Sequence, residues 1–158
     1  MSKLAIAMTL LLTSLTVAAF EPKLSKDAPV DKPIHVDTKE VLEQMHKATQ
    51  PYVQQAKKTY PAAKQRFLHG LPPGETFFLT TRLHDEAGRE EQVFIAVVSI
   101  DNGQVSGVIN SPIRGVSGYS QGQPYSFQES ELVDWLITKP DGNEEGNFVG
   151  KFLDTYQP

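Results

Sequence analysis

The sequence contains no cysteine, so the chain can form no disulfide and can carry no cysteine-linked lipid anchor. Positive charge is also scarce, because 15 Lys and Arg stand against 19 Asp and Glu, for a formal net charge of −4. Proteins that bind nucleic acids need clustered Lys and Arg to contact phosphates. No nucleic acid is therefore expected as a partner.

The first residues have the pattern of a secretory signal peptide. Lys3 precedes the apolar run Leu4–Leu12, and Val17-Ala18-Ala19 offers a cleavage site with small residues before the cut. We expect residues 1–19 to be removed near Ala19, which predicts a periplasmic or secreted protein. No later stretch is apolar over the roughly 18 residues that a membrane helix needs, so no membrane span is expected after cleavage.

The rest of the chain divides into a linker and one domain. Residues 20–36 contain three prolines and few large apolar side chains, which predicts a linker. Residues 37–158 are long enough for a single domain. This domain begins with helical spacing of apolar residues, and the spacing continues beyond two prolines. Because proline disrupts a helix interior, Pro51 and Pro61 predict two or three short helices that end at Gly70.

After Gly74 the apolar pattern changes to the two-residue period of strands. Three antiparallel strands are predicted at residues 77–83, 92–100 and 105–110, and Asn102-Gly103 is the strongest hairpin signal among them. The second strand is apolar on both faces, which predicts a central strand covered on both sides. Its predicted core residues are Phe94, Ile95 and Val97.

Further strands are predicted at residues 125–128 and 133–138, and residues 147–153 could close the sheet after a loop at 140–146. The predicted fold class is α+β. N-terminal helices pack on one face of a curled antiparallel sheet of about five strands, arranged as a meander.

Trp135 is the sole tryptophan and is predicted to lie in the core. It shares one strand face with Val133 and Ile137, whereas Asp134 falls on the opposite face and is expected to point to water. Asp134 could also join Glu129 and Glu131 in a carboxylate cluster for acid–base catalysis. Ordinary exposed acids near a strand are the preferred interpretation.

Several short features resemble a bacterial family without assigned activity, the YegJ-like domain of unknown function 2314. The resemblance extends over about residues 52–153. The residues that carry it are Thr59-Tyr60-Pro61, Glu90-Glu91, Asp101-Asn102-Gly103, Gly107, Asn110, Pro112, Gly122, Asp134-Trp135 and Gly146-Asn147-Phe148. This resemblance implies a small α+β domain that is often exported, and it supplies no catalytic residues.

The segment from Gly118 to Gly122 matches G-x-S-x-G, the pattern in which serine hydrolases hold their nucleophile. That pattern requires a helix after the serine and a later histidine. Pro124 follows Ser120 closely, and the last histidine, His84, precedes it. No catalytic residue is therefore predicted, and the chain is expected not to be an enzyme. A small periplasmic hydrolase using Ser120 or the acids near Trp135 stays as an alternative.

No metal site or cofactor is predicted either. No two histidines have the close spacing of a preformed metal site. Asp141, Asn143 and Gly146 fit positions of a calcium-binding loop, but Phe152 stands where a bidentate glutamate is required. An acidic hairpin loop explains these residues better than a weak calcium site. The four histidines are His35, His46, His69 and His84.

The glycine-rich loop at residues 111–125 is the candidate binding surface. It carries Arg114, Tyr119 and Tyr125, residue types that are enriched at interface hot spots. A merely mobile loop is the alternative interpretation. We expect an exported, non-enzymatic module that binds another envelope protein or a toxin, one form of which is an immunity-type inhibitor. A structural envelope component is a further alternative.

Overall fold

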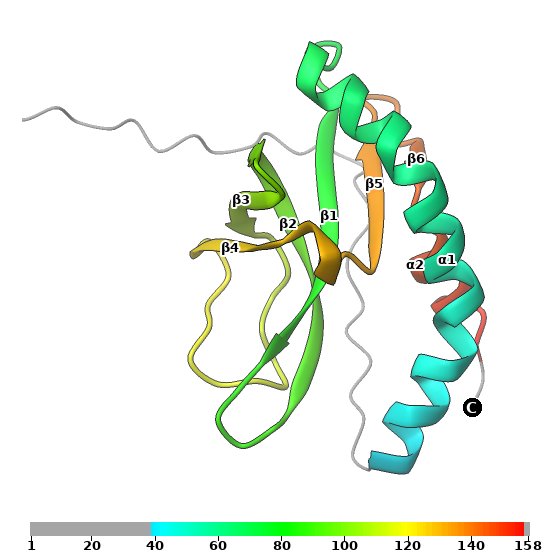
Figure 1. The fold of residues 1–158 in the computed structure, drawn as a ribbon, viewed down its shortest axis with the longest axis vertical. Coiled ribbons are helices and arrows are strands. Elements are labelled where there is room, and N and C mark those ends of the chain that lie inside the picture. The colour runs from blue at the N-terminus through cyan, green and yellow to red at the C-terminus, as the bar shows by residue number, and fades with distance from the viewer. Residues whose placement is uncertain (1–38, 157–158) are drawn as a thin grey trace, which may run out of the picture.

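The computed structural model describes residues 39–156 (Figure 1). The predicted signal peptide, the predicted linker and His35 lie outside the described residues. The elements in chain order are α1 (Lys39–His69), β1 (Thr76–His84), β2 (Glu90–Asp101), β3 (Gln104–Ile109), β4 (Pro124–Gln128), the 3₁₀ turn η1 (Glu129–Glu131), β5 (Asp134–Thr138), β6 (Glu144–Gly146) and α2 (Phe148–Leu153). None of the described helices is long and apolar enough to span a membrane.

The described chain begins with one continuous helix of 31 residues, so the prediction of two or three helices was wrong. Pro51 and Pro61 both lie inside α1 and are both exposed. Solvent can hydrate the carbonyl groups that lose their N–H donors to these prolines. The opposite face of the helix carries Ala56, Tyr60 and Ala63 into the main core. Burial of this face therefore maintains the helix through both prolines.

The six strands form one open antiparallel sheet in the order β4-β3-β2-β1-β5-β6. The predicted α+β class is confirmed, with six strands instead of about five. The meander from β1 to β3 is as predicted, and Asn102 and Gly103 turn it with φ values of 48° and 79°, as a type I′ hairpin requires. The chain then passes from β4 at one edge to β5 beside β1, so the whole sheet is not one meander.

The C-terminal part differs most from the sequence-based prediction. The predicted loop at residues 140–146 contains the edge strand β6, and the segment predicted to be a closing strand is the helix α2. Asn147 enters α2 with a left-handed φ of 56°, and the Asp134 carboxylate accepts the Val149 N–H at 2.6 Å. A side chain that is distant in sequence thus stabilises the start of this helix.

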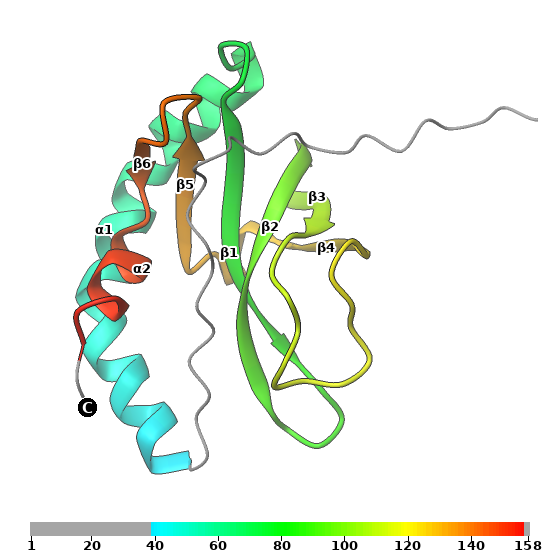
Figure 2. The same ribbon diagram turned by 180° about the vertical axis from the view of Figure 1, so that it is seen from behind.

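Both faces of the sheet carry buried apolar side chains. Ile95 and Val97 lie in the main core with α1, whereas Phe94 is half-buried on the opposite face, beside Phe78. Trp135 also belongs to the main core, and its indole N–H donates to Thr59 Oγ1 at 2.9 Å. Figure 1 shows α1 running along the β5–β6 side of the sheet, and Figure 2 shows α2 beside it.

Asp134 does not point to water, contrary to the sequence-based prediction. Only 1% of the residue is exposed, because α2 lies against β5. Burial raises the pKa of Asp134 to about 7, although the N–H groups of Val149, Trp135 and Gly150 oppose this shift. The alternation along β5 placed Asp134 on the correct face, but it could not predict that a helix covers that face.

Candidate functional site

Residues 110–123 join β3 to β4 and are called the anchored loop here. The segment at 102–128, which includes this loop, contains a single charged side chain, Arg114. In both views the anchored loop lies beside the turn between β1 and β2 (Figures 1 and 2). Two carboxylates from that hairpin hold the loop in place.

The first anchor is Glu91, near the start of β2. Its carboxylate accepts the backbone N–H groups of Arg114 at 3.0 Å, Gly115 at 2.7 Å and Val116 at 3.1 Å. Glu91 is 7% exposed and shares the core face of β2 with Val93. Three consecutive amide groups that converge on one oxyanion form a nest, a backbone arrangement that favours a negative charge. The middle of the loop is thereby fixed to the sheet.

The second anchor is Asp85, in the turn between β1 and β2. Its Oδ2 accepts the Ser117 N–H at 3.1 Å, and its carboxylate also accepts the Arg89 N–H at 2.9 Å and Arg89 Nε at 2.8 Å. Desolvation alone would raise the pKa of Asp85, but these hydrogen bonds and the nearby guanidinium outweigh it and hold the pKa well below its usual range. Asp85 therefore stays ionised and connects the hairpin turn to the loop.

Aromatic packing fixes the far end of the loop. The Tyr119 hydroxyl donates to the His84 carbonyl oxygen at 3.0 Å, and its ring meets Tyr125 edge-on with centroids 6.0 Å apart. Tyr125 in turn stacks against the core residue Phe127. Burial, with smaller contributions from Tyr119 and Glu131, raises the pKa of the Tyr125 phenol. The two tyrosines are thus half-buried and held by the core.

The structure brings only two of the three predicted binding residues together. The rings of Tyr119 and Tyr125 are in contact. Arg114 lies in the part of the loop whose backbone N–H groups bond to Glu91, and its side chain is exposed. Within residues 39–156, the Arg114 guanidinium has no hydrogen-bond or ion-pair partner. Its charge is therefore available to another molecule.

The anchors Asp85 and Glu91 were not predicted from the sequence. A signal for Glu91 was present, because the two-residue period places it on the same face as Val93 and Ile95. A charged residue at such a position must find partners. The loop amides that satisfy it lie 23 to 25 residues further along the chain, and no local pattern indicates them.

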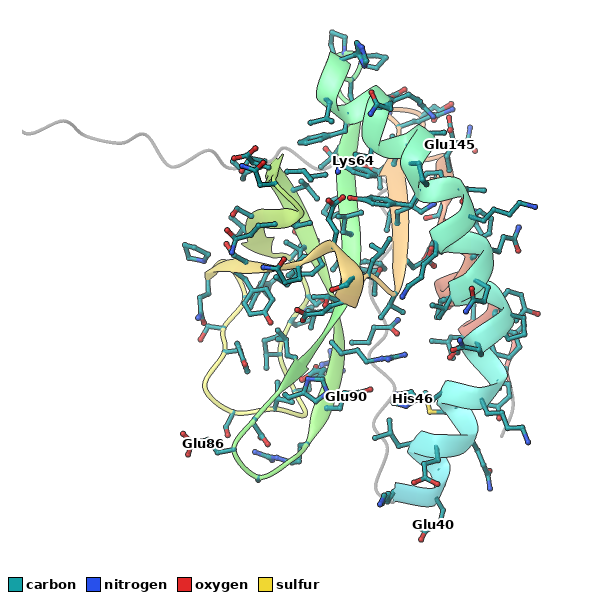
Figure 3. All side chains as sticks on the ribbon, in the orientation of Figure 1. Glu40, His46, Lys64, Glu86, Glu90 and Glu145 are labelled. Carbon is teal, nitrogen blue, oxygen red and sulfur yellow. The ribbon has the colours of Figure 1, made fainter. Side chains whose placement is uncertain are left out.

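Within residues 39–156, the alternative catalytic arrangements are not assembled. Ser120 lies in a turn that leads into β4 instead of a helix, and its N–H donates to the Gln123 side chain at 3.0 Å. His84 does not bond to Ser120 but to Glu90, at 3.1 Å. The Glu90 carboxylate also bonds to His46 at 2.6 Å and forms an ion pair with Arg82 (Figure 3). Glu90 therefore links α1 to the β1–β2 hairpin.

The three acids of the possible acid–base cluster bond to different partners. Glu129 accepts hydrogen bonds from Lys64 and Tyr60 on α1, and Glu131 accepts the Gln128 N–H. Desolvation raises the pKa of Glu129, but the bonds from Lys64 and Tyr60 outweigh it and keep the pKa below its usual value. Asp134 is buried beneath α2. Each acid thus has a structural partner of its own.

The residues of the possible calcium loop are likewise engaged with other groups. Asp141 accepts the Asn143 N–H and side-chain amide, and Glu145 pairs with Lys139 at 2.6 Å and with Arg66. Across the described part of the chain, no group of three His, Asp or Glu residues could hold a metal ion.

Comparison with known proteins gives a family but no activity. The profile of a family described as "Uncharacterized protein conserved in bacteria (DUF2314)" matches residues 39–154. The chain is also 28% identical to "Uncharacterized protein YegJ" of Escherichia coli (strain K12), over 82 residues that make up 52% of this chain and 53% of that protein. The match thus spans about half the length of this relative. No solved structure matches the chain.

Proposed function

We propose from its geometry that this chain, which belongs to the bacterial family of uncharacterised proteins DUF2314, is a non-enzymatic protein-binding module. The anchored loop is its contact surface. The observation that carries the proposal is the buried Glu91 carboxylate, which holds three consecutive loop amides.

A loop held in this way is suited to binding. An unrestrained glycine-rich loop would lose much conformational entropy when a partner immobilised it. Here Glu91 and Asp85 impose that order during folding, so less free energy is lost on association. Arg114, Ser117 and Ser120 stay exposed on the ordered loop.

The composition of the loop supports a protein partner in particular. Ser, Gly, Gln and Asn dominate it, with Tyr119 in the loop and Tyr125 just beyond. Antibody binding loops favour Tyr for contact area and Ser, Gly and Asn for adaptable hydrogen bonding, with Arg at hot spots. The same residue types on a rigid sheet fit recognition of a protein surface.

A non-enzymatic role is supported by how the acidic side chains near the loop are used. Asp85, Glu90 and Glu91 are all engaged in holding the fold. Acid–base catalysis needs a titratable group that faces a substrate. In this proposal the hairpin acids position the loop and take part in no reaction.

We infer from the predicted signal peptide that the module acts in the periplasm or outside the cell, where its partner is an envelope protein or a toxin. An immunity-type inhibitor is the narrower form of this proposal. Small size, acidity and the lack of a catalytic constellation in the described chain are consistent with that form.

Site-resolved photo-crosslinking in a bacterium that carries the protein tests this proposal. A photoreactive amino acid replaces Ser117 or Ser120 in the anchored loop, or Lys58 on the exposed side of α1 as a matched control. We expect a discrete adduct with another protein from both loop positions and none from position 58. Loop positions without an adduct, or the same adducts from all three positions, would contradict the proposal.

A further inference from the structure

The strand that follows the anchored loop lies at a free edge of the sheet. Among the described strands β4 pairs only with β3, and Figure 1 shows it at the edge away from α1. Its Pro124, Ser126 and Gln128 are all exposed. An edge strand presents backbone groups that can pair with a strand from another chain.

The register of β4 determines which backbone groups point outward. Ile109 N–H donates to the Gln123 carbonyl at 3.0 Å, and Glu129 N–H donates to the Gly103 carbonyl at 2.8 Å. Both bonds belong to the alternation in which residues 123, 125, 127 and 129 face β3. The backbone groups of residues 124, 126 and 128 therefore point away from the sheet.

Of these outward positions, only Ser126 offers an N–H that has no acceptor among the described residues. Pro124 has no N–H, and the Gln128 N–H donates to Glu131 Oε1 at 3.3 Å. The outward carbonyl groups of Pro124 and Ser126 can accept hydrogen bonds, whereas that of Gln128, the N-cap of η1, accepts the first bond of that turn. This edge thus presents one donor flanked by acceptors.

The two edges of the sheet are protected differently. The opposite edge strand, β6, has three residues, and its Glu144 and Glu145 form ion pairs with Lys151 and Lys139. β4 has no charged side chain at all. Soluble proteins commonly protect free edges with charges, so an uncharged edge that continues directly from a binding loop fits a role in binding.

We propose that the partner adds an extended segment to the edge of β4, antiparallel to it and centred on Ser126. This inference rests on the proposed function. The Ser126 N–H donates one hydrogen bond to the segment, and the carbonyls of Pro124 and Ser126 accept two. A second copy of this chain is a poorer occupant, because each β4 brings only one free N–H.

Removal of that one N–H tests the proposal. In Ser126→Pro the outward donor is lost while the β3–β4 ladder keeps its bonds, because residue 126 donates to no described strand. Ser126→Ala is the matched control, since it keeps the N–H and, like proline, loses the hydroxyl bond to Ser106. Each variant also carries the photoreactive residue at Gln128 or, separately, at Ser120.

We expect Ser126→Pro to lower the yield of partner adduct at least about tenfold, and Ser126→Ala to leave it near wild type. Circular dichroism and the melting temperature check that both variants fold. Hydrogen exchange of the wild-type chain provides a second readout. The Ser126 amide exchanges rapidly in the free protein and becomes protected in the crosslinked partner complex.

The alternative outcomes have distinct meanings. Adducts that persist in Ser126→Pro, or a Ser126 amide that stays unprotected in the complex, overturn strand addition and leave loop binding in place. An adduct with the mass of two copies of this chain overturns it as well, in favour of self-association. If neither the loop nor the edge gives a discrete adduct, the proposed function itself fails.

Discussion

Glu91 shows how one carboxylate can order a loop that is distant in sequence. Glu91→Ala removes the acceptor of three loop amides and leaves them without their buried partner. We expect a loss of about 2–3 kcal/mol in the free energy of unfolding, measured by urea titration. The amides of Arg114, Gly115 and Val116 should also exchange faster.

Glu86→Ala is the control for that prediction. Glu86 lies in the exposed turn between β1 and β2 and points away from the molecule (Figure 3). Its removal should change the free energy of unfolding by less than about 0.5 kcal/mol. Equal effects of the two substitutions would show that Glu91 does not hold the loop.

Asp134 makes stability depend on pH. Burial raises its pKa to about 7 in the folded chain, whereas an aspartate in an unfolded chain titrates near 4. The folded state thus binds the proton more tightly, and this contribution to stability is complete below about pH 4. It is lost as the pH rises to about 7, with an upper bound of about 4 kcal/mol.

Asp134→Asn removes the titrating group and should flatten the stability profile between about pH 4 and pH 7. Urea titrations at several pH values measure this slope for both proteins. Glu86→Gln, on the exposed turn, should keep the wild-type slope. An unchanged slope in Asp134→Asn would assign the pH dependence to another group.

At the scale of elements, substitutions in α1 test whether helix propensity or packing determines that this helix is continuous. Pro51→Ala and Pro61→Ala each restore an N–H inside a continuous helix at an exposed position. Each should raise the free energy of unfolding by about 1–3 kcal/mol. If the helix were broken at these residues, proline would suit the first turn of the next helix and its replacement would not stabilise the protein.

The elements that the sequence predicted are those set by local chemistry. The two-residue period and the Asn102-Gly103 turn gave the β1–β3 meander with nearly the observed bounds. Local propensity predicted helix breaks at Pro51 and Pro61, but the helix is continuous, because burial of one helix face outweighs the two missing N–H groups. It also missed α2, whose start depends on the distant Asp134 carboxylate.

The candidate site was likewise predicted only where residue type is enough to identify a residue. Residue type alone identified Arg114, Tyr119 and Tyr125 as binding candidates, but the anchors that order the loop come from another hairpin. The separation of Arg114 from the two tyrosines was equally hidden, because it depends on how the loop folds over Glu91.

At the scale of the whole molecule, charge is distributed unevenly along an acidic chain. Residues 102–128 carry one charged side chain, Arg114, and all 19 Asp and Glu of the sequence lie elsewhere. This segment, which contains no acidic residue, forms β3, the anchored loop and β4, which make up one end of the sheet (Figure 1). Charges are depleted at the centres of protein interfaces, so this end of the molecule is the one suited to a partner.

Export is a separate prediction for the whole chain. The signal-peptide pattern predicts cleavage near Ala19, so intact-mass analysis of periplasmic or secreted material should give an N-terminus near Phe20. Recovery of the full-length chain from the cytoplasm as its sole form would contradict this prediction.

The central claim is that the anchored loop binds a protein, and the affinity of the crosslinked partner for Arg114→Ala tests it most directly. Arg114 has no side-chain partner within the described residues, so its removal should leave folding unchanged. Isothermal titration should show at least about tenfold weaker binding for Arg114→Ala, as expected of a hot spot, and no change for Lys58→Ala on α1. Wild-type affinity in Arg114→Ala would contradict the account.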